Sequence, residues 1–345
     1  MRSVLNPAAR PAAVPAPEAL AASFHAGLPG YRPTPLRDLP EAAAELGLAA
    51  LAVKDESDRL GLPAFKVLGA SWAIERALRE GPEVRTLVAA SAGNHGRAVA
   101  HEAARRGLAC RVYLPARSVA ARREAIAGEG AEVVVVDGSY EDAVALAAGD
   151  GARDGVAEIA DVGDSGPASW VIDGYATIFA EVAAAAPRFD VLVVPVGVGS
   201  LAAAAARFGA AAGTSVIGAE PATAACLTAS LAGGRPVPVP TPGTVMAGLD
   251  CAEVSAAAWP LLRDGILGTV TVSDAEARAA IRDLARAGLA IGESGAAPLA
   301  ALRALSTDPL CAALREAAGL GGAARVLLLA TEGPTDPVSY RAALS

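Results

Sequence analysis

Short apolar runs alternate along the chain with longer, alanine-rich stretches. The runs are continuous rather than alternating in polarity, which is typical of strands buried on both faces of a sheet. They predict strands at residues 51–53, 86–90, 109–114, 132–136, 191–196, 215–219, 269–272 and 326–330. The stretches between them predict helices at 67–79, 95–106, 120–128, 140–149, 175–185, 200–207, 274–287 and 297–305. This alternation indicates an α/β fold with largely parallel sheets.

Composition narrows the class of protein. Hydrophobic residues make up 53% of the chain, so a large core is expected, and the net charge of −8 gives no basic stripe for nucleic acid. No run of eighteen uninterrupted apolar residues occurs, so no membrane span is predicted. Prolines from Pro7 to Pro17 break any signal-peptide pattern, and the first 30 residues are expected to form a loose arm that docks on the body.

The cysteines are widely spaced, at Cys110, Cys226, Cys251 and Cys311. Their spacing does not match a zinc site. Cys226 and Cys251 could meet across a loop, a question that the sequence leaves open. We expect an intracellular, cytoplasmic protein whose thiols are mostly reduced.

Lysine is scarce, because only Lys54 and Lys66 occur among 29 basic residues. A lysine kept in an arginine-rich chain is a candidate chemical group, since arginine cannot lose its proton and form an imine with an aldehyde. Lys54 stands in the charged run 54–59, which favours a solvated surface charge. Lys66 stands in the apolar segment 62–69, where a reactive amine and a surface charge are both reasonable interpretations.

A glycine-rich turn, Gly197-Val198-Gly199-Ser200, follows a predicted buried strand and opens a helix. Its backbone amides and the helix N-terminus suit a phosphate monoester, to which Ser200 can add a hydroxyl donor. The turn completes neither a P-loop nor a dinucleotide fingerprint. A tight strand-to-helix turn without any ligand is the alternative.

Two further segments carry polar groups at predicted strand ends. In the segment 89–96, Ser91, Asn94 and the loop amides can bind a carboxylate or a phenolate oxygen; alternatively, Ser91 or Asn94 caps a helix. His95 is either a ligand-facing donor or a packed helix residue. Thr331 ends the last strand, where a hydroxyl is a neutral partner for a ring nitrogen.

An imine-forming lysine, a phosphate cup, an oxygen-binding asparagine and a strand-end hydroxyl are the parts that hold pyridoxal phosphate. In these motifs the chain resembles the fold-type II pyridoxal-phosphate enzymes, the tryptophan synthase β-like group, and within them the diaminopropionate ammonia-lyases. The matching stretches are 31–36, 54–57, 64–69, 93–97, 173–175, 197–200, 244–249, 292–295 and 331–336. The resemblance implies two open, mostly parallel sheets flanked by helices, with a large domain at 1–83 and 171–345, a small mobile domain at 84–170, and a homodimer.

The resemblance also implies a role for each motif. Lys66 would form the imine with the cofactor, and Phe65 would pack beside its ring. Asn94 would bind the ring oxygen, Thr331 the ring nitrogen, and Gly197, Val198, Gly199 and Ser200 the phosphate. Ser91, Ala92 and His95 would line the substrate. Lys54 is assigned to structure.

One departure from the family pattern bears on stereochemistry. The ammonia-lyases have an aspartate, the base for D-substrates, where this chain has Ala92. The acid that acts on the L-isomer is best matched by Asp161, with Asp164 as its rival. The resemblance therefore predicts α,β-elimination of ammonia from L-2,3-diaminopropionate or a close β-substituted alanine. The alternatives are serine or threonine dehydration, racemisation, β-replacement that makes a non-protein amino acid, or a catalytically silent ligand-binding homologue.

Overall fold

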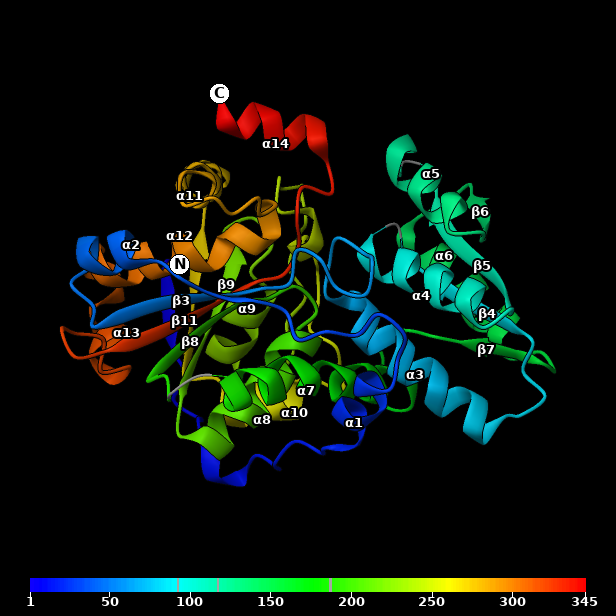
Figure 1. The fold of residues 1–345 in the computed structure, drawn as a ribbon, viewed down its shortest axis with the longest axis horizontal. Helices are drawn as coiled ribbons and strands as arrows, with labels where there is room; N and C mark the ends of the chain where they lie inside the picture. The colour runs from blue at the N-terminus through cyan, green and yellow to red at the C-terminus, as the bar shows by residue number, and fades with distance from the viewer. Residues whose placement is uncertain (92, 117, 186–187) are drawn as a thin grey trace. The chain divides into compact units, whose positions relative to one another are not determined.

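The computed structural model describes residues 1–91, 93–116, 118–185 and 188–345. The chain forms two compact units, unit 1 (Met1–Phe65 and Tyr175–Ser345) and unit 2 (Lys66–Gly174). Each contains one sheet flanked by helices (Figure 1). The predicted α/β class with two mostly parallel sheets is therefore confirmed.

Unit 1 contains a seven-stranded sheet in the order β1-β10-β9-β8-β11-β3-β2. Its five inner strands run parallel, and β1 and β2 pair antiparallel at the two edges. The strands are β1 (Ser3–Leu5), β2 (Leu36–Asp38), β3 (Ala50–Asp55), β8 (Val191–Pro195), β9 (Ser215–Pro221), β10 (Gly268–Val272) and β11 (Arg325–Ala330).

Helices cover both faces of this sheet, with α11 and α12 on one face and α8 and α10 on the other (Figure 1). The main apolar core lies between the sheet and the pair α11 and α12. The α-helices of unit 1 are α1 (Leu20–Ala26), α2 (Pro40–Glu45), α8 (Ser200–Ala212), α9 (Cys226–Gly233), α10 (Trp259–Gly265), α11 (Asp274–Arg286), α12 (Glu293–Thr307), α13 (Ala312–Ala317) and α14 (Pro337–Leu344). Three 3₁₀ turns accompany them: η1 (Pro11–Ala13), η2 (Ala247–Leu249) and η3 (Pro309–Cys311).

Unit 2 contains a four-stranded parallel sheet in the order β6-β5-β4-β7. Its strands are β4 (Thr86–Ala90), β5 (Ala109–Pro115), β6 (Glu132–Val136) and β7 (Val156–Glu158). Its helices are α3 (Lys66–Glu80), α4 (Asn94–Arg105), α5 (Ala120–Gly128), α6 (Tyr140–Gly151) and the first part of α7 (Pro167–Ala185), which enters unit 1 after Gly174. Residues 66–83 and 171–174, which the resemblance placed with the large domain, lie in unit 2, where α3 packs on α4.

All eight predicted strands and all eight predicted helices are present; three match the predicted bounds at both ends and the others have shifted ends. The largest shift is in α7, which begins eight residues before the predicted 175. The N-terminal segment differs from the expected loose arm, since β1 is hydrogen-bonded to β10 and α1 and η1 follow. The other elements missing from the prediction are short, from three to eight residues, which is too short for hydrophobic periodicity to show.

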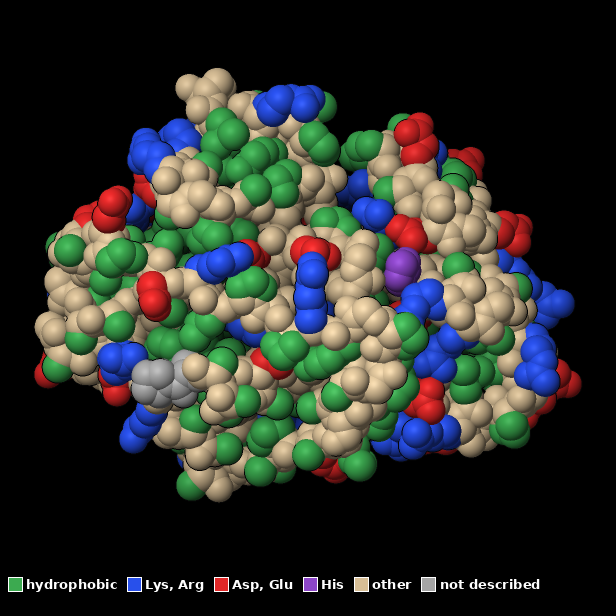
Figure 2. Space-filling model, viewed as in Figure 1, with side chains coloured by type: hydrophobic (Ala, Val, Ile, Leu, Met, Phe, Trp, Pro, Cys, Tyr) green, Lys and Arg blue, Asp and Glu red, His purple; other side chains and the backbone are tan. Residues whose placement is uncertain are grey.

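The surface carries charges of both signs. On the face in view, Lys and Arg side chains are interspersed with Asp and Glu (Figure 2). In the part of the chain that the structure describes, no helix is long and apolar enough to cross a membrane.

Candidate functional site

Lys66 is the first residue of α3, and its amine is paired with a carboxylate in the same unit. Its Nζ donates a hydrogen bond to Oδ2 of Asp161 at 2.8 Å. Asp161 lies in the loop between β7 and α7. The two side chains are 20% and 15% exposed, so the pair is sheltered without being sealed. Asp164, the rival acid, is exposed and accepts a hydrogen bond from its neighbour Ser165 instead.

His95 is buried close to this pair. Its Nε2–H donates to the carbonyl of Ile159 at 2.7 Å, which leaves Nδ1 facing Oδ2 of Asp161 at 3.9 Å. Burial lowers the pKa of His95 and favours the neutral ring. Burial alone would raise the pKa of Asp161, but the positive charge of Lys66 and its hydrogen bond to the carboxylate hold it well below its usual range. Asp161 is therefore a carboxylate at neutral pH.

The turn from β4 into α4 positions Ser91 and Asn94. The helix cap is Gly93, whose N–H donates to Ser91 Oγ at 3.3 Å, and Asn94 is the first helical residue. The alternative that Ser91 or Asn94 caps this helix is therefore wrong. A Cβ on Gly96 would lie 2.2 Å from the Ser91 carbonyl oxygen, so only glycine permits this close turn. Ala92 lies outside the described residues.

The glycine-rich turn of unit 1 joins β8 to α8 as predicted. Gly199 has φ +94°, and a Cβ there would lie 2.6 Å from Leu262 Cδ1, so both conformation and space require glycine. A Cβ on Gly197 would lie 2.9 Å from the carbonyl oxygen of Gly248. The turn delivers the N-terminal amides of α8 and the buried Ser200, a donor set suited to a phosphate.

The end of β11 is linked directly to the residue that precedes Lys66. The N–H of Phe65 donates to the Thr331 carbonyl at 3.2 Å, and Ala64 forms a β-bridge with Glu332. The Phe65 ring packs against Tyr175, with ring centroids 4.7 Å apart. Thr331 is buried. The backbone that leads into Lys66 is thus fixed against the strand end that carries the predicted ring-nitrogen partner.

A polar chain ties the same strand end to the glycine-rich turn. Ser294 N–H donates to Glu332 Oε1 at 3.3 Å, and Ser294 Oγ accepts from Gly248 N–H at 3.1 Å. Gly248 in turn packs closely on Gly197, since a Cβ on Gly197 would lie 2.9 Å from the Gly248 carbonyl oxygen. The sequence indicated these stretches as motifs but gave no function to Ser294.

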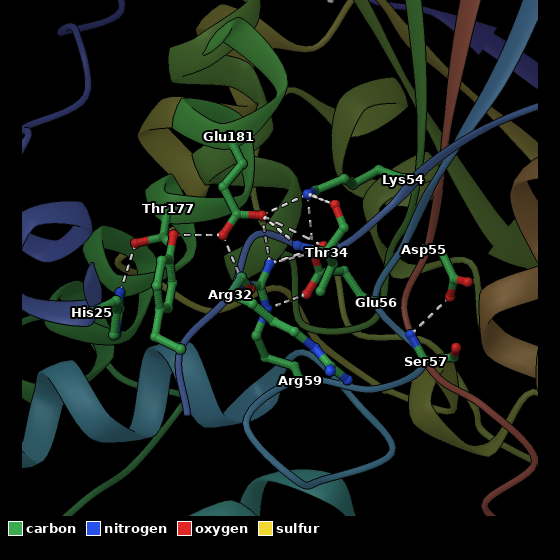
Figure 3. Close-up of polar contacts among 11 residues, drawn as sticks. His25, Arg32, Thr34, Lys54, Asp55, Glu56, Ser57, Arg59, Thr177 and Glu181 are labelled. Carbon is green, nitrogen blue, oxygen red and sulfur yellow. Dashed lines mark hydrogen bonds and ion pairs between the residues drawn. The ribbon is translucent and has the colours of Figure 1, made fainter. Parts of the chain in front are cut away.

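Lys54 is buried in an ion network, which corrects the prediction of a solvated surface charge. Its Nζ donates to Glu181 Oε2 at 2.5 Å and to the Thr34 carbonyl at 2.7 Å (Figure 3). Arg59 binds both Glu56 and Glu181. Sequence reasoning missed Arg59 and Glu181. The available signal was one acid, Glu181, in the otherwise apolar second half of α7.

The structure thus brings the predicted residues together within each unit. One cluster in unit 2 contains Lys66, Asp161 and His95. In unit 1 a backbone hydrogen bond joins Phe65 to Thr331. Cys226 and Cys251, whose pairing the sequence left open, are not joined by a disulfide.

The whole chain is similar to known proteins in sequence and in fold. The family described as pyridoxal-phosphate dependent enzyme matches residues 28–332. Diaminopropionate ammonia-lyase from Escherichia coli is 34% identical over 93% of this chain and 89% of its own length. The biosynthetic L-threonine dehydratase of Escherichia coli is 29% identical over 78% of this chain and 52% of its own. A crystal structure of the Escherichia coli ammonia-lyase with an aminoacrylate–pyridoxal-phosphate azomethine intermediate superposes with a TM-score of 0.89, at 31% identity over 99% of this chain and 96% of that one.

Proposed function

Because the chain belongs to the family of pyridoxal-phosphate dependent enzymes, we propose that it is an ammonia-lyase acting on 2,3-diaminopropionate. The reaction consumes one diaminopropionate and one water and yields one pyruvate and two ammonia. The observation that carries the proposal is the hydrogen bond of 2.8 Å between Lys66 Nζ and Asp161 Oδ2. It pairs an amine able to bind an aldehyde with a carboxylate able to hold a proton.

The chemistry of the donor set fits this cofactor. Lys66 supplies the amine for the covalent link, and the amides of residues 197–200 with the Ser200 hydroxyl supply the phosphate donors. Asn94 is assigned to the ring oxygen and Phe65 to the ring face. Thr331 is assigned to the ring nitrogen, where a neutral hydroxyl does not favour protonation. When bound, pyridoxal phosphate supplies an electron sink that makes the substrate α-proton removable.

Proton transfer falls to Lys66 and Asp161. Asp161 is ionised, because its pKa lies well below the usual range, and its contact with Lys66 lets a proton pass between the two groups. His95 donates its Nε2–H to the Ile159 carbonyl, and burial lowers its pKa, so the neutral ring does not compete with Lys66 for the carboxylate. Ser91 and the loop around it are assigned to the substrate carboxylate. An alanine at position 92 cannot carry a proton, so we propose a preference for the L-isomer.

Turnover of both isomers tests this proposal. The enzyme loaded with cofactor is given L- and D-2,3-diaminopropionate, and pyruvate and ammonia are measured separately. We expect two ammonia for each pyruvate from the L-isomer and slow turnover of the D-isomer. Turnover of the D-isomer at a rate comparable to that of the L-isomer would overturn the stereochemical assignment. If neither isomer gave pyruvate, the proposed lyase activity would be overturned.

A dehydratase-like or β-replacement reaction is the second candidate. It is favoured by the alanine at position 92, where the ammonia-lyases have an aspartate, and by the similarity to L-threonine dehydratase over 78% of the chain. With L-serine, elimination would give one ammonia for each pyruvate. A β-replacement would give a new amino acid, detectable by mass spectrometry when a thiol is supplied. Racemisation would appear as the opposite isomer on a chiral column.

The proposed oligomer and location follow from the resemblance. We expect a cytoplasmic homodimer, which size-exclusion chromatography with light scattering and cell fractionation would test.

A further inference from the structure

We propose that Arg59 and Glu181 are positioning residues for Lys66. They act through the segment 56–65, here called the lysine loop, which runs from the end of β3 to the residue before Lys66. This inference rests on the proposed role of Lys66 as the cofactor-binding amine. It assigns a role in cofactor attachment to groups that are buried and do not belong to the lysine's own cluster.

Arg59 fixes the middle of the lysine loop. Its Nε and Nη2 donate to the two carboxylate oxygens of Glu56 at 2.8 and 2.6 Å. Its Nη1 and Nη2 donate to the two oxygens of Glu181 at 2.6 and 2.9 Å (Figure 3). The Arg59 side chain is 1% exposed. A planar fork that meets two carboxylates in this way holds one geometry, which a lysine at this position could not reproduce.

The backbone of the loop depends on this anchor. Arg59 and Leu62 exchange two backbone hydrogen bonds of 2.8 and 3.0 Å around a tight turn. Leu60, inside the turn, has φ +52°, a left-handed conformation unfavourable for a leucine. Such strain persists where surrounding contacts overdetermine it, and the buried Arg59 side chain provides those contacts.

Helix α7 holds the loop at two points. Glu181 on this helix binds Arg59, and Tyr175 on the same helix packs on Phe65 with ring centroids 4.7 Å apart. Phe65 also donates its N–H to Thr331. The loop therefore leaves Phe65, and the start of Lys66, with little freedom. Rigid support of this kind is what a reacting side chain needs to meet its partner in a fixed geometry.

Stability alone does not account for the choice of residues. The four charges of the network, Lys54, Arg59, Glu56 and Glu181, sum to zero and are almost completely buried. Apolar residues of similar volume would often stabilise a fold equally well, whereas a network of hydrogen-bonded charges selects one arrangement. We infer that this arrangement is the position of the lysine-bearing backbone.

The test compares two ligands that differ in one group. Pyridoxal phosphate can bond covalently to Lys66, and 4′-deoxypyridoxine phosphate, which has no aldehyde, cannot. Both affinities are measured for the full-length apo-protein and for two variants, Tyr31→Phe and Arg59→Met. Tyr31→Phe removes only the hydroxyl that donates to Glu181 Oε1 at 2.7 Å, so it keeps the test usable if Arg59→Met does not fold.

If the ion network positions Lys66, the variants should lose more affinity for pyridoxal phosphate than for the deoxy analogue. In Arg59→Met the affinity for pyridoxal phosphate should fall at least about tenfold, while that for the deoxy analogue changes less than about twofold, because only the first needs an aligned lysine. Tyr31→Phe should show a smaller loss in the same direction. Equal losses of both ligands in the folded variants, or no loss of either, would overturn the inference.

A matched control separates this role from general loss of an ion network. Arg303 also binds two acids, Glu45 and Asp283, away from the lysine loop, so Arg303→Met should change neither affinity. Borohydride reduction of the wild-type holoenzyme, followed by peptide mass mapping, checks the premise. No adduct on Lys66 and equal affinity for both ligands would overturn the proposed function as well. An adduct on Lys66 with evenly affected variants would overturn the positioning role alone.

Discussion

Replacing Glu181 by glutamine should cost a large part of the stability of unit 1 at neutral pH. The substitution keeps the shape of the side chain but removes one negative charge from a network whose four charges balance. Lys54 and Arg59 would then face Glu56 alone and leave one buried positive charge uncompensated. Removing one partner of a buried pair typically costs about 3–5 kcal/mol.

The pKa of Glu181 gives an independent magnitude. Burial alone would raise this pKa, but the hydrogen bonds and charges of Arg59 and Lys54 lower it from 4.5 to about 2. That difference corresponds to about 3 kcal/mol in favour of the folded state. Because the folded pKa is the lower one, this stability is present above pH 4.5 and is lost as the pH falls towards 2.

Urea unfolding followed by circular dichroism measures both effects. At pH 7 we expect the free energy of unfolding to fall by about 3–5 kcal/mol in Glu181→Gln. The gap in unfolding free energy from the wild type should narrow below pH 4.5, because the Glu181 carboxylate then gains its proton first in the unfolded wild type. Glu45→Gln is the control, since Glu45 pairs with Arg303 with its side chain 53% exposed and should cost less than about 1 kcal/mol. A Glu181→Gln variant within about 1 kcal/mol of the wild type would refute the reasoning.

Three further substitutions test the proposed site. Lys66→Ala should abolish both the visible absorbance of bound cofactor and pyruvate formation, and persistence of that absorbance would contradict the assignment of Lys66. Asp161→Asn should lower kcat for the L-isomer about 10²–10⁴-fold while the absorbance remains, and an unchanged kcat would point to another base. Gly199→Ala places a Cβ at φ +94° and 2.6 Å from Leu262, so it should cost about 1–3 kcal/mol of stability and weaken cofactor binding. Titration of the apo-protein with pyridoxal phosphate measures that binding, and an unchanged affinity would contradict the role of this turn in holding the phosphate.

Motif reasoning from the sequence was strongest where one local segment carries the whole signal. The glycine-rich turn is one case, because left-handed geometry at Gly199 is a local property of the chain. The start of the helix predicted at 274–287 is another, because Ser273 and Glu276 form a capping box within four residues of sequence. The sequence could not choose between Asp161 and Asp164. They are the same residue type three positions apart in one loop, so only their three-dimensional surroundings differ. Contact with Lys66 distinguishes them in the structure.

By itself the sequence determined the α/β class and the order of the long strands and helices, and it singled out the segments that we assign to the cofactor. These follow from hydrophobic patterning and from turns whose conformation is set within a few residues. Only the tertiary structure decided that Lys54 is buried, that Arg59 is paired with Glu181 across 122 residues of sequence, and that Phe65 is bonded to the end of β11. A lysine in a run of charged residues, such as Lys54, is predicted to be exposed to solvent, because lysines are rarely buried without a paired charge. Its paired charge, Glu181, lies on a helix far along the chain, so only the tertiary structure shows that Lys54 can be buried.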